Sequence, residues 1–280
     1  MIKIINIENA SKEDILTRDI KLESGVEAIV ADIINNVREN GDAALKEYAL
    51  RFDKAQIDNL RVTEAEIDAA YNNEDPELIA TLEMAKKNIW AFHEKQLRKG
   101  FEINEGNGIV AGQKITPIEK VGIYVPGGTA SYPSTVLMNA IPAKIAGVSE
   151  IIMVTPPDKE GNIPSAILCA AKIAGVDTII KTGGAQAVAA LAYGTESVPK
   201  ADKVVGPGNV FVATAKRMLY GLVDIDMIAG PSEILVLADG TCNPKYVAAD
   251  LLSQAEHDRL ASAVLVTDSY ELAEKVSAEL

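Results

Sequence analysis

The stretch Val121-Gly-Ile-Tyr-Val-Pro-Gly-Gly128 shows the pattern that decides the fold. A short apolar run rich in Val and Ile, bounded by Pro-Gly-Gly, is typical of a buried strand that ends in a tight turn. From residue 108 onward such runs recur, and helical stretches separate them. This alternation predicts a parallel sheet that is covered by helices on both faces.

The expected elements of this region follow from the same pattern. The expected strands are Val121 to Val125, Glu150 to Val154, Thr178 to Lys181, Lys203 to Val205, Glu233 to Leu237 and Ala263 to Thr267. The expected helices are Ser134 to Ala146, Pro164 to Ala174, Ala185 to Ala192, Val210 to Tyr220 and Pro244 to Glu256. Because ligands of such sheets collect outside the carboxyl ends of the strands, the candidate site is sought there.

The first 100 residues carry about as many charged side chains as the 180 that follow, and they predict helices with solvated outer faces. These helices are Glu27 to Glu39, a second after Asn40-Gly41, one opened by the capping box Thr63-x-x-Glu66, and a long one from Pro76 to Lys99. This region is interpreted as a helical arm or lid. Trp90, Phe92 and His93 in the long helix are interpreted as a stripe that docks it on its neighbour rather than as ligand contacts.

Composition excludes several classes of protein. With 280 residues and 48% hydrophobic content, the chain has room for a substantial core, and its net charge of -13 argues against nucleic acid or anionic lipid as a partner. No apolar run is long enough to span a membrane, and Met1 to Ile7 is too short for a signal peptide, so we expect a cytoplasmic protein. Cys169 and Cys242 are expected to be reduced, with Cys169 in the core.

Four glycine-containing turns follow or precede the expected elements. They are Val125-Pro-Gly-Gly128, Lys181-Thr-Gly-Gly184, Val205-Gly-Pro-Gly-Asn209 and Ala229-Gly-Pro-Ser232. A tight reversal favours glycine with no ligand at all, and none of the turns matches G-x-G-x-x-G. Together, however, they favour a ligand such as a dinucleotide, because glycine lets the backbone approach a ligand and free N–H groups at a helix start suit a pyrophosphate. These turns would present Tyr124, Gln186, Asn209 and Ser232.

A second candidate feature is the helix that Asn243 and Pro244 open as cap and first residue. Gln254 and His257 are three residues apart on one face of this helix and could share a ligand or a metal ion. The alternative is that His257 only complements the negative end of the helix dipole. Spacing does not decide between the two, because an amide is an unusual zinc ligand.

Six segments together resemble the histidinol dehydrogenase family, and they occur in the order in which the family has them. They are Gly122-Ile-Tyr-Val-Pro-Gly-Gly128, Pro133-Ser-Thr-Val-Leu-Met138, Gly183-Gly-Ala-Gln-Ala187, Gly206-Pro-Gly-Asn209, Ala229-Gly-Pro-Ser-Glu233 and Ser253-Gln-Ala-Glu-His257. The resemblance implies an α/β fold with two incomplete Rossmann-like parallel sheets and flanking helices, similar to aldehyde dehydrogenases, preceded by the N-terminal helical arm. It implies a helical arm over 1–107, an NAD-binding Rossmann-like domain over 108–240, and the start of a zinc and substrate portion over 241–280.

The resemblance also implies an activity. The family is a zinc- and NAD-dependent homodimeric enzyme of histidine biosynthesis, with one zinc per subunit, and it oxidises L-histidinol via L-histidinal to L-histidine. Matched position by position, Tyr124, Gln186 and Asn209 would contact NAD. A second set, Ser232, Gln254 and His257, would contact L-histidinol, and Gln254 and His257 would also bind zinc.

The sequence departs from the family at its C-terminal side. The family's catalytic Glu-His pair and two further zinc ligands would lie beyond Leu280, and the only histidines are His93 and His257. Two protein ligands should hold zinc poorly. We therefore expect a C-terminally truncated, inactive form with no catalytic residue of its own.

Two alternatives of other classes remain open. The chain could be a non-catalytic nucleotide-binding or scaffold subunit, with its acidic helical arm as the docking surface. It could also use Cys242 as a nucleophile of the aldehyde dehydrogenase kind, although no histidine or carboxylate is evidently paired with that thiol.

Overall fold

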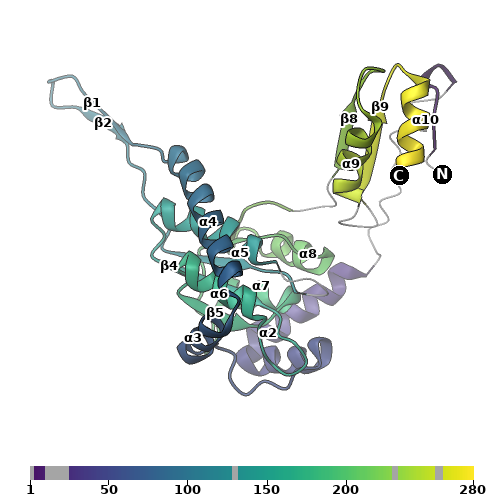
Figure 1. Ribbon diagram of the computed structural model, residues 1–280. Coiled ribbons are helices and arrows are strands. Elements are labelled where there is room, and N and C mark those ends of the chain that lie inside the picture. The colour runs from purple at the N-terminus through teal and green to yellow at the C-terminus, as the bar shows by residue number, and fades with distance from the viewer. Residues whose placement is uncertain (1–2, 10–24, 128–131, 229–232, 256–260) are drawn as a thin grey trace. The chain divides into compact units, whose positions relative to one another are not determined.

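Five parallel strands form the central sheet (Figure 1). In the computed structural model, which describes residues 3–9, 25–127, 132–228, 233–255 and 261–280, these strands match the expected ones closely. They are β3 (Lys120–Tyr124), β4 (Glu150–Thr155), β5 (Thr178–Lys181), β6 (Lys203–Val205) and β7 (Asp224–Ile225). They lie in the order β5-β4-β3-β6-β7, and every neighbouring pair is parallel. Only β7 was not expected, because two residues are too few to make a pattern.

Both faces of this sheet are apolar. In β4, Ile151 and Met153 belong to one buried cluster, whereas Ile152 and Val154 belong to another, as the alternation of side chains along a strand requires. The first cluster is formed with α5 (Pro133–Ala146) and α6 (Ser165–Ala174), on which α3 (Glu64–Asn73) and α4 (Pro76–His93) pack. The second is formed with α2 (Val26–Tyr48), α7 (Gly184–Tyr193) and α8 (Val210–Leu219).

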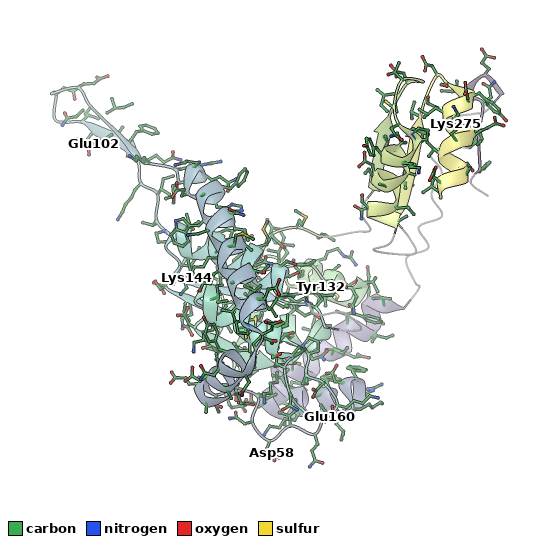
Figure 2. The ribbon with its side chains drawn as sticks, viewed as in Figure 1. Asp58, Glu102, Tyr132, Lys144, Glu160 and Lys275 are labelled. Carbon is green, nitrogen blue, oxygen red and sulfur yellow. The ribbon has the colours of Figure 1, made fainter. Side chains whose placement is uncertain are left out.

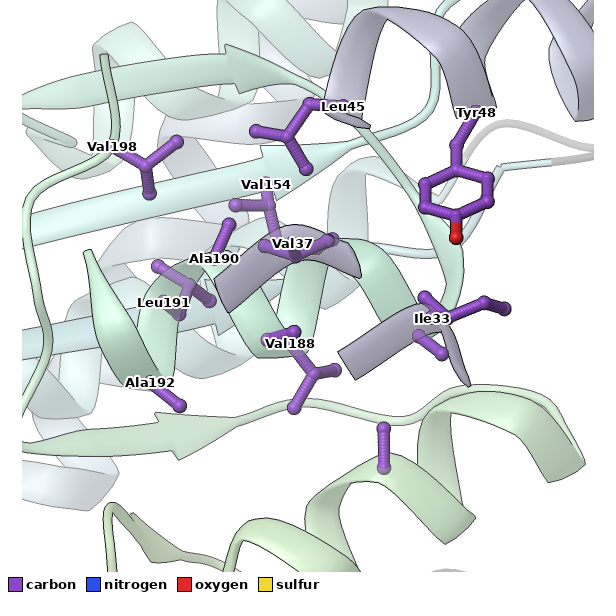
Figure 3. Close-up of a cluster of buried hydrophobic side chains, with 14 of the residues drawn as sticks. Ile33, Val37, Leu45, Tyr48, Val154, Val188, Ala190, Leu191, Ala192 and Val198 are labelled. Atoms are coloured by element: carbon purple, nitrogen blue, oxygen red, sulfur yellow. The ribbon is translucent and has the colours of Figure 1, made fainter. Parts of the chain in front are cut away.

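Helix α2 joins the N-terminal helical region directly to the sheet. Ile33, Val37 and Leu45 lie among Val188 and other residues of α7 in the same cluster (Figure 3). The two helices expected on either side of Asn40-Gly41 are both present within the range of α2, and they meet at a kink where Gly41 leaves helical geometry at φ 50° and ψ −129°. A π-helical turn, η2 (Ala49–Asp53), continues α2.

The caps of the next two helices decide where they begin. Thr63 and Glu66 form the expected capping box of α3, and the Asp75 side chain accepts a hydrogen bond from the Glu77 backbone N–H at the start of α4. The expected docking stripe on α4 was wrong, since Trp90 is 41% exposed and Phe92 is 66% exposed. The side chains that do dock α4 on the sheet helices are Leu78, Ile79, Leu82, Ala85 and Ile89. After α4, the chain makes the short turn η3 (Glu94–Gln96).

An antiparallel hairpin follows, formed by β1 (Phe101–Asn104) and β2 (Val110–Gln113). It was not expected, although the sequence Asn107-Gly108 in its loop is a strong hairpin signal. All residues of both strands are exposed. The boundary expected at residue 107 falls inside this loop.

The chain divides into two compact units, residues 23–229 and a smaller one made of residues 1–22 and 230–280. The described part of the smaller unit contains η1 (Ile7–Asn9), the parallel strands β8 (Glu233–Leu237) and β9 (Ser262–Val266), and the helices α9 (Pro244–Ala255) and α10 (Tyr270–Glu279). A second parallel sheet is therefore present, as the resemblance implied. The three functional regions 1–107, 108–240 and 241–280 stay predictions.

Smaller expectations can also be compared with the structure. Cys169 is buried in α6 and Cys242 is exposed, and both are free thiols. Asn243 accepts a hydrogen bond from the Lys245 backbone N–H at 3.0 Å and so caps α9 as expected. None of the helices among the described residues has the length and apolar character that crossing a membrane requires.

Candidate functional site

One cavity lies outside the carboxyl ends of the strands of the larger unit. Its volume is about 1130 Å³, and its walls come from the turns after β3, β4, β5 and β6 together with α2 and η2. The order of the strands reverses here, because β4 and β5 lie on one side of β3 while β6 and β7 lie on the other. Ligands of open parallel sheets bind at such a switch point.

Tyr124 is the last residue of β3 and lines this cavity, although it is only 4% exposed. Its hydroxyl oxygen accepts a hydrogen bond from the backbone N–H of Gly184 at 3.0 Å. Burial raises the pKa of the Tyr124 phenol; the Gly184 N–H lowers it, and the charge of the nearby Asp53 carboxylate raises it again. The net pKa lies above the ordinary value, so Tyr124 is a neutral hydroxyl at physiological pH.

Gln186 stands in the first turn of α7 and is 3% exposed. Its side-chain amide lines the cavity and makes no hydrogen bond to any residue that the structure describes. A Cβ atom at Gly184, whose φ is +67°, would lie 2.7 Å from the Gln186 Oε1 atom. Glycine at this position therefore leaves room for the amide, and a buried amide that no described residue pairs with is suited to a ligand.

Asn209 serves two purposes at the cavity. It caps α8, since its Oδ1 atom accepts hydrogen bonds from the backbone N–H groups of Phe211 at 3.1 Å and Val212 at 3.2 Å. Because the oxygen is used by the cap, the amide NH₂ group is the part that remains for a ligand. The turn before it lies against β3: Gly206 has φ +111°, and a Cβ atom there would overlap the Tyr124 carbonyl oxygen.

The glycines after β3 and β5 are explained first by packing. A Cβ atom at Gly183 would lie 2.7 Å from Pro156, and one at Gly127 would overlap the ring of the same proline. Both turns therefore close on the Pro156 turn after β4, and glycine is needed for that contact whether or not a ligand binds. The expected alternative was that a tight reversal needs glycine for its backbone angles. Packing against Pro156, without a ligand, is the reason that the structure gives for these two glycines.

Sequence reasoning missed the wall that α2 and η2 provide. Tyr48 and Phe52 line the cavity with stacked rings whose centroids are 5.5 Å apart. Asp53 lies beside them, and burial raises the pKa of its carboxyl group to about 6. No local motif could have indicated these residues, because they reach the cavity only through the packing of α2 on α7.

The second set of predicted site residues is Ser232, Gln254 and His257, of which the described residues include Gln254. Gln254 lies half-buried in α9, in the smaller unit. Ser232 and His257 lie outside the described residues, as does the turn Ala229-Gly-Pro-Ser232. Within the ranges that the structure covers, no three His, Cys, Asp or Glu side chains gather where they could hold a metal ion. The expected zinc and substrate contacts of Gln254 and His257 therefore stay predictions.

Comparison with known proteins identifies the relatives of this chain. The family model described as histidinol dehydrogenase matches residues 16–280. The chain belongs to the histidinol dehydrogenase family. It is 56% identical to the histidinol dehydrogenase of Lactiplantibacillus plantarum over 281 aligned residues, which cover 98% of this chain and 64% of the relative. With the histidinol dehydrogenase of Clostridium acetobutylicum the identity is 59% over 248 residues, which cover 89% of this chain and 58% of the relative.

Solved structures agree with this assignment. The crystal structure of histidinol dehydrogenase from Elizabethkingia anophelis superposes with a TM-score of 0.88 at 42% identity, over 94% of this chain and 61% of that one. An NAD-dependent benzaldehyde dehydrogenase from Corynebacterium glutamicum superposes with a TM-score of 0.51 at 14% identity, which shows likeness of fold alone. The expected fold class is confirmed. The chain spans less than two thirds of the length of the curated relatives named above.

Proposed function

We propose that the cavity of the larger unit binds NAD and that this chain supplies the NAD-binding part of a histidinol dehydrogenase. Such an enzyme of histidine biosynthesis oxidises L-histidinol via L-histidinal to L-histidine and reduces two molecules of NAD. One observation carries the proposal: Tyr124, Gln186 and Asn209, which the family resemblance matches to the cofactor, line a single cavity at the switch point of the sheet.

The shape and donors of the cavity fit a dinucleotide. Its volume of about 1130 Å³ is slightly above the usual range for small-molecule sites, which leaves room for a large ligand. Helix α7 begins at Gly184 without a side-chain cap. The Gly184 N–H donates to Tyr124, and the N–H groups that follow it in the first turn are suited to an anion such as a pyrophosphate. Bound NAD supplies the acceptor for the hydride that leaves the substrate carbon.

The side chains have separate roles in this proposal. Gln186 offers both an amide oxygen and an amide NH₂ group, whereas Asn209 offers only its NH₂ group because its oxygen caps α8. Tyr124 anchors the start of α7 through Gly184 and keeps its own hydroxyl proton for the ligand. In this proposal the described residues bind and orient the cofactor.

Zinc and the substrate L-histidinol are proposed for the second set of residues, Ser232, Gln254 and His257. The described residues do not by themselves make a zinc site. The sequence of 280 residues holds two histidines. One of them, His93, ends α4, and its Nδ1 atom lies 2.7 Å from the Oε1 atom of Gln96 in η3. We therefore propose that residues 1–280 alone bind the cofactor without completing a turnover.

A homodimer in the cytoplasm completes the proposal. The hairpin β1–β2 supports self-association, because it exposes four large apolar side chains. They are Phe101, Ile103, Ile109 and Val110. The solution mass of the chain, measured by light scattering, tests the dimer.

The alternative role as a scaffold subunit instead predicts a stable complex with a full-length homologue and a rise in that homologue's activity.

Calorimetric titration with NAD tests the cofactor site. We expect one binding site per chain, and Gln186→Ala should weaken it about fivefold because one or two neutral hydrogen bonds are lost. Tyr124→Phe should also weaken it, whereas Tyr246→Phe, on the exposed face of α9, should not. Absence of binding, or equal affinity of the Gln186 and Tyr246 variants, would contradict the proposal. Formation of NADH from L-histidinol by the chain alone would contradict the proposed lack of turnover.

A further inference from the structure

Asp53 places a carboxylate in the wall of the cavity, and the described residues offer it no partner. It forms no hydrogen bond or ion pair with any residue in the described ranges. The neighbouring cations are engaged elsewhere, since Lys54 Nζ donates to the Arg51 carbonyl oxygen at 2.8 Å and the Arg51 guanidinium lies over the Phe52 ring, 5.3 Å from its centroid. A ligand that fills the cavity and excludes water must therefore supply the donors that this carboxylate needs.

Tyr124 offers the complementary group in the same cavity. Its hydroxyl oxygen already accepts from Gly184, so its proton remains to be donated, and no described residue accepts it. Asp53 is close enough for its charge to act on the Tyr124 phenol. A donor and an acceptor that face one space suit a group that both donates and accepts, which is the property of a sugar hydroxyl.

The charges around Asp53 oppose an additional anion. The other charged side chains of the cavity wall are the carboxylates Asp32, Asp158 and Glu160 and the cations Arg51 and Lys159. Carboxylates therefore outnumber cations. A phosphate brought to Asp53 would meet like charge, whereas a neutral hydroxyl would not.

We propose that Asp53 is a specificity-determining residue, which accepts hydrogen bonds from ribose hydroxyls of the bound dinucleotide and opposes a phosphate ester at that position. The site therefore selects NAD over NADP. This inference rests on the proposed role of the cavity as an NAD site. It adds a wall residue from the N-terminal helical region to the three residues on the sheet side.

Titration of NAD and NADP by calorimetry at pH 7.5 tests the proposal with five proteins. In the unsubstituted chain, NADP should bind at least about tenfold more weakly than NAD, because like charges are brought together. Asp53→Asn should weaken the binding of NAD about tenfold, as expected for the loss of hydrogen bonds to a charged acceptor. It should also remove most of the difference in affinity between NAD and NADP. Asp58→Asn removes an exposed carboxylate five residues along the chain (Figure 2), and it should change neither affinity.

The fourth protein distinguishes a direct contact of Asp53 with the ligand from a general effect of negative charge on the preference for NAD. Asp32 is an exposed residue of the cavity wall, so Asp32→Asn removes the same charge from the rim and should leave most of the preference for NAD. Asp53→Ser provides a second neutral variant and should shift the ratio as Asp53→Asn does. Circular dichroism and the fluorescence of Trp90 establish that each variant is folded.

The outcomes distinguish the inference from the function on which it rests. A chain that binds neither dinucleotide overturns both. If the unsubstituted chain binds NAD but Asp53→Asn lowers the affinities for NAD and NADP by the same factor, the inference is overturned and the NAD site stands. The inference is also overturned if Asp32→Asn closes the gap as fully as Asp53→Asn does.

Discussion

Lys216 of α8 forms a buried ion pair with Asp226, the residue that follows β7. Lys216 is 2% exposed, and its Nζ atom also donates to the Gly206 carbonyl oxygen at 3.0 Å. The Asp226 Oδ2 atom accepts from the Gly206 N–H at 2.8 Å. Both backbone groups of Gly206 are thus held by one ion pair. Because Gly206 lies against Tyr124, this pair fixes the turn that carries Asn209.

Replacement of Lys216 by Met should lower the free energy of unfolding by about 3 kcal/mol, because it leaves a partly buried carboxylate and the Gly206 carbonyl without their donor. Urea unfolding followed by Trp90 fluorescence measures this loss for the larger unit. Lys203→Met is the matched control, since Lys203 at the start of β6 pairs at 2.6 Å with the exposed Asp224 at the start of β7. That change should cost at most about 1 kcal/mol. Equal losses in the two variants would contradict the role of the buried pair.

Replacement of two glycines with similar φ angles can distinguish the cost of backbone strain from the cost of steric overlap. Gly206 has φ +111° and Gly221 has φ +101°, but a Cβ atom at Gly221 would have no heavy atom within 4 Å. Gly221→Ala should therefore cost about 1 kcal/mol from the backbone angle alone and leave NAD affinity unchanged. Gly206→Ala should cost more, because it also displaces Tyr124 or the turn, and it should weaken NAD binding. Urea unfolding and calorimetry measure the two effects, and equal behaviour of the variants would count against the close approach.

The sheet could be predicted from the sequence because its strands are buried on both faces. Runs such as Ile151 to Val154 are then apolar throughout, which separates them from the helices on either side. The hairpin β1–β2 could not be found in this way, since its strands are exposed and carry no core pattern. The prediction for Trp90 and Phe92 was wrong because it followed a common pattern that does not hold in this helix. Large aromatic side chains often dock a helix on its neighbour, but in α4 smaller aliphatic residues make that contact.

The candidate site could be predicted on its sheet side only. Tyr124, Gln186 and Asn209 sit in turns whose position follows from the strand pattern and whose role follows from the family resemblance. Asp53 reaches the same cavity from far earlier in the sequence, and neither spacing nor charge pattern marks it. Its place depends on the kink at Gly41 and on the contact of α2 with α7, which are properties of tertiary packing.

The carboxyl group of Asp53 should make stability depend on pH. Its ordinary pKa is 3.8, and burial raises the pKa to about 6 in the folded chain. Between these values the folded chain holds a proton that the unfolded chain has released, so stability falls as the pH rises through this window and the cost is complete at neutral pH. Asp53→Asn should therefore be more stable at pH 7.5 by about 1 kcal/mol, a discounted value because the group is only partly buried.

This advantage of Asp53→Asn should shrink toward zero as the pH falls from 6 to 4. Urea unfolding at both ends of the range measures it, with Asp58→Asn as the control for the loss of an exposed charge. A difference that stays constant with pH would show that the carboxyl group of Asp53 titrates normally in the folded chain. The same substitution is expected to weaken NAD binding, so stability and affinity should change in opposite directions.

The small sheet of the second unit exposes an apolar face. Ile234, Val236 and Leu265 pack on one side against a cluster formed with α9 and α10. The side chains that alternate with them are exposed, and the register places Leu235 beside Val264 and Leu237 beside Val266. Parallel sheets are normally covered on both faces. An exposed apolar face of this kind should therefore bind apolar dyes and favour association between chains.

The double substitution Leu235→Ser and Leu237→Ser should therefore lower the fluorescence of anilinonaphthalene sulfonate bound to the chain and slow the growth of light scattering at high concentration. Tyr246→Ser removes an exposed apolar side chain from α9, on the covered side of the sheet, and should change neither signal appreciably. Because the inner residues Ile234 and Val236 are untouched, the double variant should keep its helical circular dichroism. Dye binding that is the same in both variants would mean that the apolar surface detected by the dye lies elsewhere on the chain.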